Sequence, residues 1–120
     1  MLIFRAEHVP MILKLPGYPP KTATRRLWKT QRVKAGSVQK CYSICNCTGR
    51  LQPFANVHVS QVYPQIMLYM SPDQIAAEGY PGWTVDQFAE KFIEVNRLKR
   101  SILYVLSLVP YVVEFELEAP

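Results

Sequence analysis

The sequence lacks the short motifs that identify common enzyme and nucleotide-binding classes. It has no glycine-rich phosphate loop, no zincin motif, no serine nucleophile elbow and no Cys/His pair with a plausible orienting partner. Internal repeats and low-complexity segments are also absent. The function must therefore be inferred from residues that form no standard catalytic signature.

Long apolar runs are missing as well. The longest, 102–113, is broken by Ser107 and Pro110 and is too short to cross a bilayer. Residues 1–7 lack the basic start and long apolar core of a secretory signal. We therefore expect a cytoplasmic protein with no membrane partner.

Cysteine is scarce, with three residues at Cys41, Cys45 and Cys47. An odd count in a cytoplasmic chain argues against a disulfide framework. Zinc sites usually use four ligands and close Cys-x-x-Cys pairs, whereas the spacing here is three and then one. His58 could supply a fourth ligand, but buried or idle thiols fit the pattern better. We expect no metal and no cofactor.

Acidic residues are scarce in the first half of the chain. Residues 1–50 contain ten Lys/Arg and one acid, Glu7, which gives +9. Residues 51–120 contain four Lys/Arg and eight acids, which gives −4 and a total of +5. This segregation predicts a positive face that attracts polyanions such as nucleic acid.

The composition is that of a folded chain, with 49% hydrophobic and 19% charged residues among 120. This length predicts a single domain, 1–120. Ten prolines predict short elements with abrupt ends.

Hydrophobic periodicity and turn residues predict a mixture of strands and helices. Strands are expected at 2–4, 24–28, 38–45, 54–63 and 111–118. Helices are expected over 7–14, over 71–78 with Ser71 as N-cap, and after the N-cap Thr84. Turns are expected at 34–37 and 46–50, whereas 99–109 is ambiguous between helix tail, loop and strand.

Two of these patterns assign faces. In 54–63 the alternation places His58 on the polar side, which favours a surface or groove contact. In the last helix an apolar stripe at helical spacing indicates core rather than a cofactor site. The stripe consists of Val85, Phe88, Phe92 and Val95.

The segment 21–26 combines an amine, two hydroxyls and two guanidiniums. If it is extended, Thr22, Thr24 and Arg26 share one face, which suits a phosphate. The alternative is a solvated basic edge strand. The candidate nucleic-acid-binding residues are Lys21, Thr22, Arg25, Arg26, Trp28 and Arg32. The aromatic residues that could stack on bases are Tyr18, Trp28, Tyr42 and Phe54.

Several motifs, in order along nearly the whole chain, resemble the ASCH domain family, in particular its small phage or prokaryotic members. The first half carries Phe4, His8, Met11-Ile12-Leu13, Lys21-Thr22-x-Thr24-Arg25-Arg26 and Val33-x-x-Gly36. The second half carries Pro53-Phe54-Ala55, Glu78-Gly79-Tyr80, Thr84 with Phe88, and Val112-Val113-Glu114-Phe115-Glu116.

The resemblance implies an α+β, PUA-like fold: a mostly antiparallel β-barrel with short flanking helices. It also implies RNA binding in a cleft lined by the Lys-Thr-x-Thr-Arg segment. One similar group removes the acetyl group from acetylcytidine nucleosides, and another cleaves RNA. By position, the residues of the amidohydrolase group correspond to Lys21, Thr24 and Glu78.

Two main hypotheses follow. The first is a module that binds RNA or a nucleotide in a basic cleft. The second is a small amidohydrolase, with Thr24 as nucleophile and Glu78 orienting Lys21 or the substrate amide. Lys21 would act as base if burial and neighbouring arginines lower its pKa. A weaker third hypothesis is a regulatory protein with an acidic protein partner.

Overall fold

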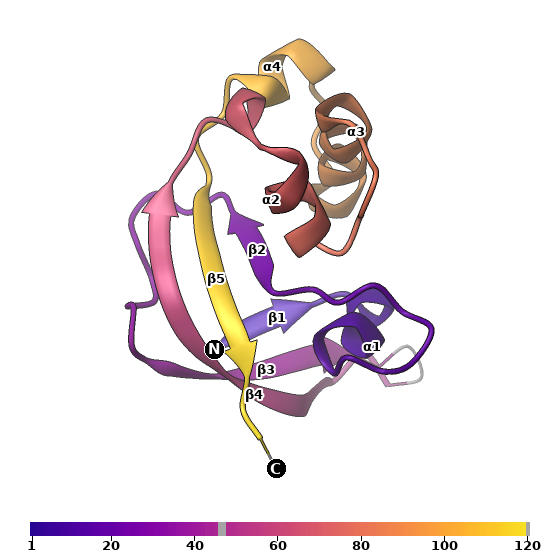
Figure 1. Cartoon of the computed structure of the whole chain (residues 1–120), viewed down its shortest axis with the longest axis vertical. Helices are drawn as coiled ribbons and strands as arrows, with labels where there is room; N and C mark the ends of the chain where they lie inside the picture. Colours follow the sequence, from indigo (N-terminus) through magenta and orange to yellow (C-terminus); the bar gives the residue numbers. More distant parts are fainter. Residues whose placement is uncertain (46–47, 120) are drawn as a thin grey trace.

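The fold is a curled five-stranded sheet with short helices, seen in a computed structural model that describes residues 1–45 and 48–119 (Figure 1). The strand order is β1-β3-β4-β5-β2. β1 runs parallel to β3, and the other neighbours are antiparallel. The strands are β1 Leu2–Phe4, β2 Ala23–Arg26, β3 Val38–Ile44, β4 Leu51–Pro64 and β5 Tyr111–Leu117.

The helices gather mainly at one end of the sheet (Figure 1). The two 3₁₀ turns are η1 Ala6–His8 and η2 Met67–Tyr69. The α-helices are α1 Val9–Ile12, α2 Pro72–Ala77, α3 Val85–Asn96 and α4 Ile102–Leu106. No helix in the described ranges is long and apolar enough to span a membrane.

Two separate hydrophobic clusters stabilise the structure. One packs on the sheet and includes Phe4, Val57 and Phe115. The other lies among η2 and the helices and includes Phe88 and Phe92. Because apolar burial provides most of the driving force for folding, the sheet and the helical end each have their own core.

Most predicted elements are confirmed. β4 buries Val57 and Val59 and exposes His58, as its alternation predicts. Ser71 and Thr84 accept hydrogen bonds from the third residue of α2 and α3, so both predicted N-caps are correct. The ambiguous segment 99–109 contains α4, which Ser101 caps.

Several predicted boundaries are wrong, and proline explains two of them, whereas β4 begins at Leu51, three residues before its expected start at 54. The strand expected at 24–28 ends at Arg26 because Arg26 pairs with Tyr111 of β5, and the preceding Pro110 has no N–H to donate. The helix expected over 7–14 is split into η1 and α1, since Pro10 cannot donate the hydrogen bond that would join them.

The predicted turn at 34–37 is present, with Ser37 N–H donating to Lys34 O at 3.2 Å and Gly36 at φ +85°. The predicted hairpin turn at 46–50 falls partly outside the described residues, because 46 and 47 are not described. Its ends are closed by Cys45 N–H donating to Arg50 O at 2.9 Å.

Candidate functional site

A cleft of about 660 Å³ separates the sheet from the helical end. The walls come from β1, η1, β2, the residues after α2, and α3. Its charged lining consists of the basic residues Arg5, Lys21, Arg25, Arg26, Lys91 and Arg97 and the acids Glu7 and Glu78. Six basic and two acidic side chains give the lining a formal net charge of +4.

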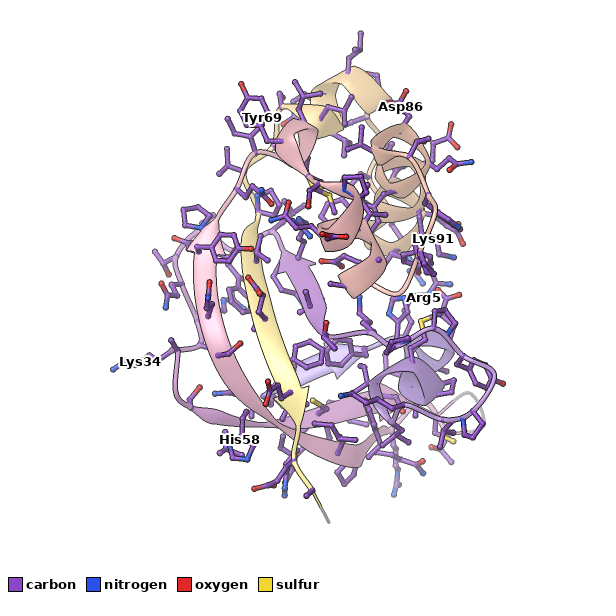
Figure 2. All side chains as sticks on the ribbon, viewed as in Figure 1. Arg5, Lys34, His58, Tyr69, Asp86 and Lys91 are labelled. Carbon is purple, nitrogen blue, oxygen red and sulfur yellow. The ribbon has the colours of Figure 1, made fainter. Side chains whose placement is uncertain are left out.

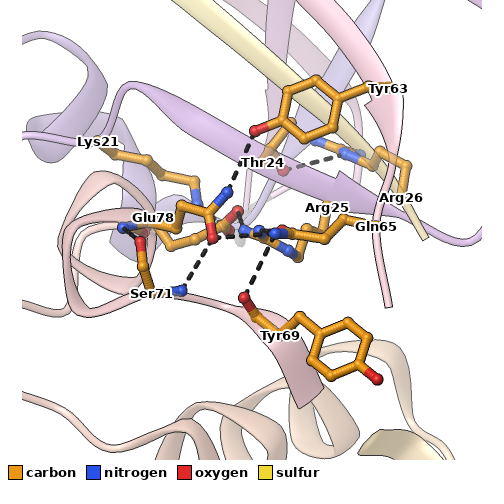
Figure 3. Close-up of polar contacts among 10 residues, drawn as sticks. Lys21, Thr24, Arg25, Arg26, Tyr63, Gln65, Tyr69, Ser71 and Glu78 are labelled. Carbon is orange, nitrogen blue, oxygen red and sulfur yellow. Dashed lines mark hydrogen bonds and ion pairs between the residues drawn. The ribbon is translucent and has the colours of Figure 1, made fainter. Parts of the chain in front are cut away.

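Lys21 and Arg25 meet Glu78 at the back of this cleft (Figure 3). Lys21 Nζ donates to Glu78 Oε1 at 3.2 Å and to the Glu78 carbonyl oxygen at 2.9 Å. Arg25 Nη1 donates to Glu78 Oε2 at 2.8 Å. All three side chains are buried, so two cations share one anion away from solvent.

The main chain fixes this cluster in place. Lys21 N–H donates to Met11 O at 3.1 Å, and Thr22 N–H donates to Ala77 O at 2.7 Å. Gly79, at φ +103°, allows the close approach after α2, since a Cβ there would lie 2.7 Å from Met11 Sδ. The start of β2 is thereby held against both α1 and the end of α2.

Burial lowers the pKa of Lys21 below its usual value. The negative charge and hydrogen bond of Glu78 oppose this shift, whereas the positive charges of Arg26 and Arg25 add to it. The pKa of the lysine is therefore lowered despite its carboxylate partner.

Arg25 extends the polar cluster to the helical end. Its Nη2 donates to Gln65 Oε1, and Gln65 Nε2 donates to Gln74 Oε1 at 3.1 Å (Figure 3). Gln74 Nε2 in turn donates to the Tyr63 hydroxyl at 3.3 Å. Arg25 therefore links β2 with β4 and α2 and has no exposed side-chain surface.

Arg26 is the half-buried cation of β2. Its Nε donates to Thr24 Oγ1 at 3.2 Å, which confirms that these two residues share a face. The guanidinium carbon lies 4.8 Å from the centre of the Phe4 ring. Among the described residues its two terminal nitrogens have no hydrogen-bond partner, so they are available to a ligand.

His8 and Tyr80 form a buried polar pair on the same cleft. His8 Nε2 lies 2.9 Å from the Tyr80 hydroxyl. Burial, together with the charges of Lys21, Lys91, Arg5 and Arg26, lowers the pKa of His8 to about 3. Burial also raises the pKa of Tyr80 to about 12, so both groups are neutral near pH 7.

Ion pairs join the two walls at the rim of the cleft, near the labels of Arg5 and Lys91 in Figure 2. Lys91 Nζ lies 3.3 Å from Glu7 Oε1 and 3.7 Å from Glu94 Oε1. Arg5 Nη1 lies 3.8 Å from Glu94 Oε1. These contacts connect η1 with α3.

The other candidate binding residues lie outside the cleft lining. Thr22 is half-buried, and its main-chain oxygen accepts a hydrogen bond from Phe115 N–H of β5. Thr22 is not among the residues that line the cleft. Trp28 packs on Tyr111, with ring centres 6.1 Å apart, and Arg32 is exposed. Among the stacking candidates, Phe54 packs edge-on against Phe4 in the sheet core.

The cleft includes residues that sequence reasoning did not propose as site residues. They include Arg5, Glu7, His8, Tyr80, Lys91 and Arg97. His8 and Tyr80 belong to the motifs that resemble the ASCH family, so the sequence did contain a signal that could have identified them as site residues. In the sequence, Lys91 stands between Phe88 and Phe92, two members of the apolar stripe that was interpreted as core. Both phenylalanines also line the cleft.

Cys41 and His58 are not among the residues that line the cleft. Cys41 is fully buried in the sheet core, and burial raises the pKa of its thiol to about 11. His58 lies 3.4 Å from Glu118 on the exposed side of β4. Within 1–45 and 48–119, no three His, Cys, Asp or Glu side chains gather as metal ligands. Cys47 lies outside the described residues.

The sequence matches no protein-family model and no curated protein. The fold, however, is similar to solved structures. A DUF984-family protein of Enterococcus faecalis aligns with a TM-score of 0.67 and 20% identity over 93% of this chain and 67% of that one. An ASCH domain of Lactobacillus crispatus aligns with a TM-score of 0.56 and 14% identity over 91% of this chain and 69% of that one. The chain therefore has an ASCH-like, PUA-like α+β fold.

Proposed function

We propose that the cleft binds either a free nucleotide or a stretch of one or two nucleotides within single-stranded RNA. The basic lining of the cleft would hold the phosphate. The observation that carries this proposal is the net charge of +4 on a cleft of about 660 Å³. This volume lies within the usual range for small-molecule sites. The resemblance to ASCH domains, which are regarded as RNA-binding, supports the same ligand class.

Arg26 is the proposed phosphate ligand. Its Nε bond to Thr24 and its contact with Phe4 fix the guanidinium before a ligand arrives. The terminal nitrogens then form the planar fork that binds a phosphate with two hydrogen bonds. A fixed side chain loses less conformational entropy on binding than a free one.

Lys21 and Arg25 have an indirect role in this proposal. Both side chains are buried and donate to Glu78. They therefore attract the phosphate of the ligand through their positive charge and do not contact it directly. Arg5 and Arg97 lie at the exposed parts of the lining, Lys91 is half-buried at the rim, and together they attract the phosphate from solution.

Titration calorimetry with a mixed-sequence RNA dinucleotide carrying a 5′-phosphate tests the proposal. Arg26→Gln removes a charged two-bond contact and should weaken binding about tenfold or more. Arg32→Gln removes the same group from an exposed site outside the cleft, and should have little effect. Equal losses in the two variants, or no binding by the wild type, would contradict the proposal.

A second candidate function is hydrolysis of an acetylated nucleoside. The observation that favours it is the buried Lys21, whose pKa is lowered, on the same cleft as Thr24. Thr24 would attack the acetyl carbon while Lys21 accepts its proton. The amide C–N bond would then break, cytidine would leave with that proton on its amino group, and water would hydrolyse the acetyl ester of Thr24 to acetate. Among the described contacts Lys21 donates to Glu78 and not to Thr24, so binding is the better supported function.

Incubation with 4-acetylcytidine, followed by chromatography for cytidine and acetate, tests this second candidate. Turnover that is lost in both Thr24→Val and Lys21→Ala would establish it. Thr24→Val is nearly isosteric and separates loss of the hydroxyl from loss of folding. Absence of turnover in a wild-type sample that binds the dinucleotide would reject it.

A further inference from the structure

The four basic residues of the second half of the chain are concentrated on one part of the fold. They are Lys91, Arg97, Lys99 and Arg100. Lys91 and Arg97 line the cleft, and Lys99 and Arg100 are exposed in the segment that follows α3. The basic lining of the cleft therefore continues along the chain toward α4.

This segment is anchored to the helical core. Arg97 ends α3 in the left-handed conformation, at φ +52°, and its N–H donates to Glu94 O at 3.3 Å. Leu98 N–H donates to Ile93 O at 3.0 Å, and its side chain packs on the helical core. These hydrogen bonds thus hold in place the main chain that carries the basic side chains on either side of Leu98.

The charges in this segment are uncompensated. No acidic side chain within the described residues forms an ion pair with Arg97, Lys99 or Arg100, whereas Arg5 and Lys91 at the same cleft are paired. Three cations within four residues repel one another, so a bound polyanion lowers their energy.

An exposed aromatic ring lies directly beside these charges. The Arg100 guanidinium carbon lies 4.9 Å from the centre of the Tyr104 ring. Tyr104 is 46% exposed, and its neighbour Leu103 is 81% exposed. A cation next to an exposed ring is the combination that binds the phosphates and bases of single strands.

We infer that Arg97, Lys99 and Arg100, here called the basic track, together with Tyr104 bind the single-stranded RNA that leaves the cleft. The inference rests on the proposed function. Arg97 and Arg100 are at most about 10 Å apart along an extended chain, so the track holds nucleotides adjacent to the cleft. Continuity with the cleft favours RNA over an acidic protein segment.

The experiment compares the dinucleotide with a mixed-sequence RNA of about 12 nucleotides, a length within the range of single-strand sites. The double variant Lys99→Ala/Arg100→Ala is compared with Lys29→Ala/Lys34→Ala, which removes two exposed lysines outside the cleft lining. Figure 2 shows Lys34 on the side of the molecule away from Lys91.

We expect the track variant to bind the longer RNA more weakly and to bind the dinucleotide as the wild type does. The slope of log affinity against log salt should become shallower by about 1.4, or about 0.7 for each lost phosphate contact. Tyr104→Leu should weaken binding of the longer RNA about fivefold or more, with the slope unchanged.

Each remaining outcome is decisive. Unchanged binding of the longer RNA by the track variant, with dinucleotide binding intact, overturns the inference alone. Equal losses in the track and control variants show a general charge effect and also overturn it. Competition by polyglutamate as strong as by RNA assigns the track to an acidic protein. Failure of the wild type to bind either RNA overturns the proposed function as well.

Discussion

Lys21 Nζ lies 3.2 Å from Glu78 Oε1, although 57 residues separate the two in the sequence. The same carboxylate accepts a hydrogen bond from Arg25 at 2.8 Å. The buried cluster therefore holds two basic groups and one acid, and this imbalance determines how it responds to mutation.

Removing the acid should destabilise the fold far more than removing the lysine. Glu78→Gln leaves Lys21 and Arg25 buried without a counter-ion and should cost about 3–5 kcal/mol. Lys21→Met leaves the Arg25–Glu78 pair balanced and should cost clearly less. Urea unfolding followed by tryptophan fluorescence measures both. Equal costs, or a larger cost for Lys21→Met, would show that Glu78 does not neutralise the cluster.

Acid should destabilise the protein through His8. Its pKa is about 3 in the folded protein and about 6.5 when unfolded, so between these values the unfolded chain binds more protons. His8 therefore makes stability fall as pH decreases from about 6.5 toward 3, by up to about 1.4 kcal/mol per pH unit. Above pH 6.5 this contribution is constant.

The matched variant for this prediction is His8→Gln, which keeps a hydrogen-bonding partner for the Tyr80 hydroxyl. We expect urea midpoints of the variant to depend less on pH below 6.5 than those of the wild type. Parallel pH profiles for the two proteins would mean that His8 titrates normally in the folded state.

Glycine is required at position 79 for two reasons. Its φ of +103° disfavours other residues, and an added Cβ would lie 2.7 Å from Met11 Sδ. Gly79→Ala should destabilise the protein by about 1–3 kcal/mol. Gly82→Ala is the control, because Gly82 also has a positive φ but nothing lies within 4 Å of its added Cβ. A larger loss at Gly82, measured by thermal unfolding, would contradict the proposed contact.

Neutralising the acid at the rim should strengthen RNA binding. Glu7→Gln raises the net charge of the cleft lining from +4 to +5 and frees Lys91 from one ion pair. Because Glu7 is partly exposed, the effect on stability should be less than about 1 kcal/mol. Calorimetry with the dinucleotide should show tighter binding that weakens with salt. Unchanged or weaker affinity would mean that the cleft does not attract phosphate.

The strands were predictable because each is encoded locally. The alternation of valines with polar residues in 54–63 specifies β4 without reference to the rest of the chain. The end of β2 was not predictable in this way, since it depends on Pro110, the residue just before β5, with which β2 pairs. Pairing partners distant in sequence leave no local pattern.

The candidate site was predictable only where its residues lie close together in the sequence. Lys21, Thr24 and Arg26 stand together in one segment, whereas Glu78 could be added only through the family resemblance. Residues on the second wall, such as Lys91, reach the cleft because α3 packs across from η1. That packing is a property of the tertiary structure, so the helical stripe indicated only a core face.

The central claim is that RNA binds in the cleft, and the most direct test is to locate the binding site on the protein. An NMR titration of the isotope-labelled protein with the phosphorylated dinucleotide follows every backbone amide. We predict shifts confined to residues 3–8, 21–26, 78–80 and 88–97 and to Ile44, which together contain the residues that line the cleft. Shifts centred instead on the exposed side of β4 around His58, or on the 29–34 loop, would contradict the account.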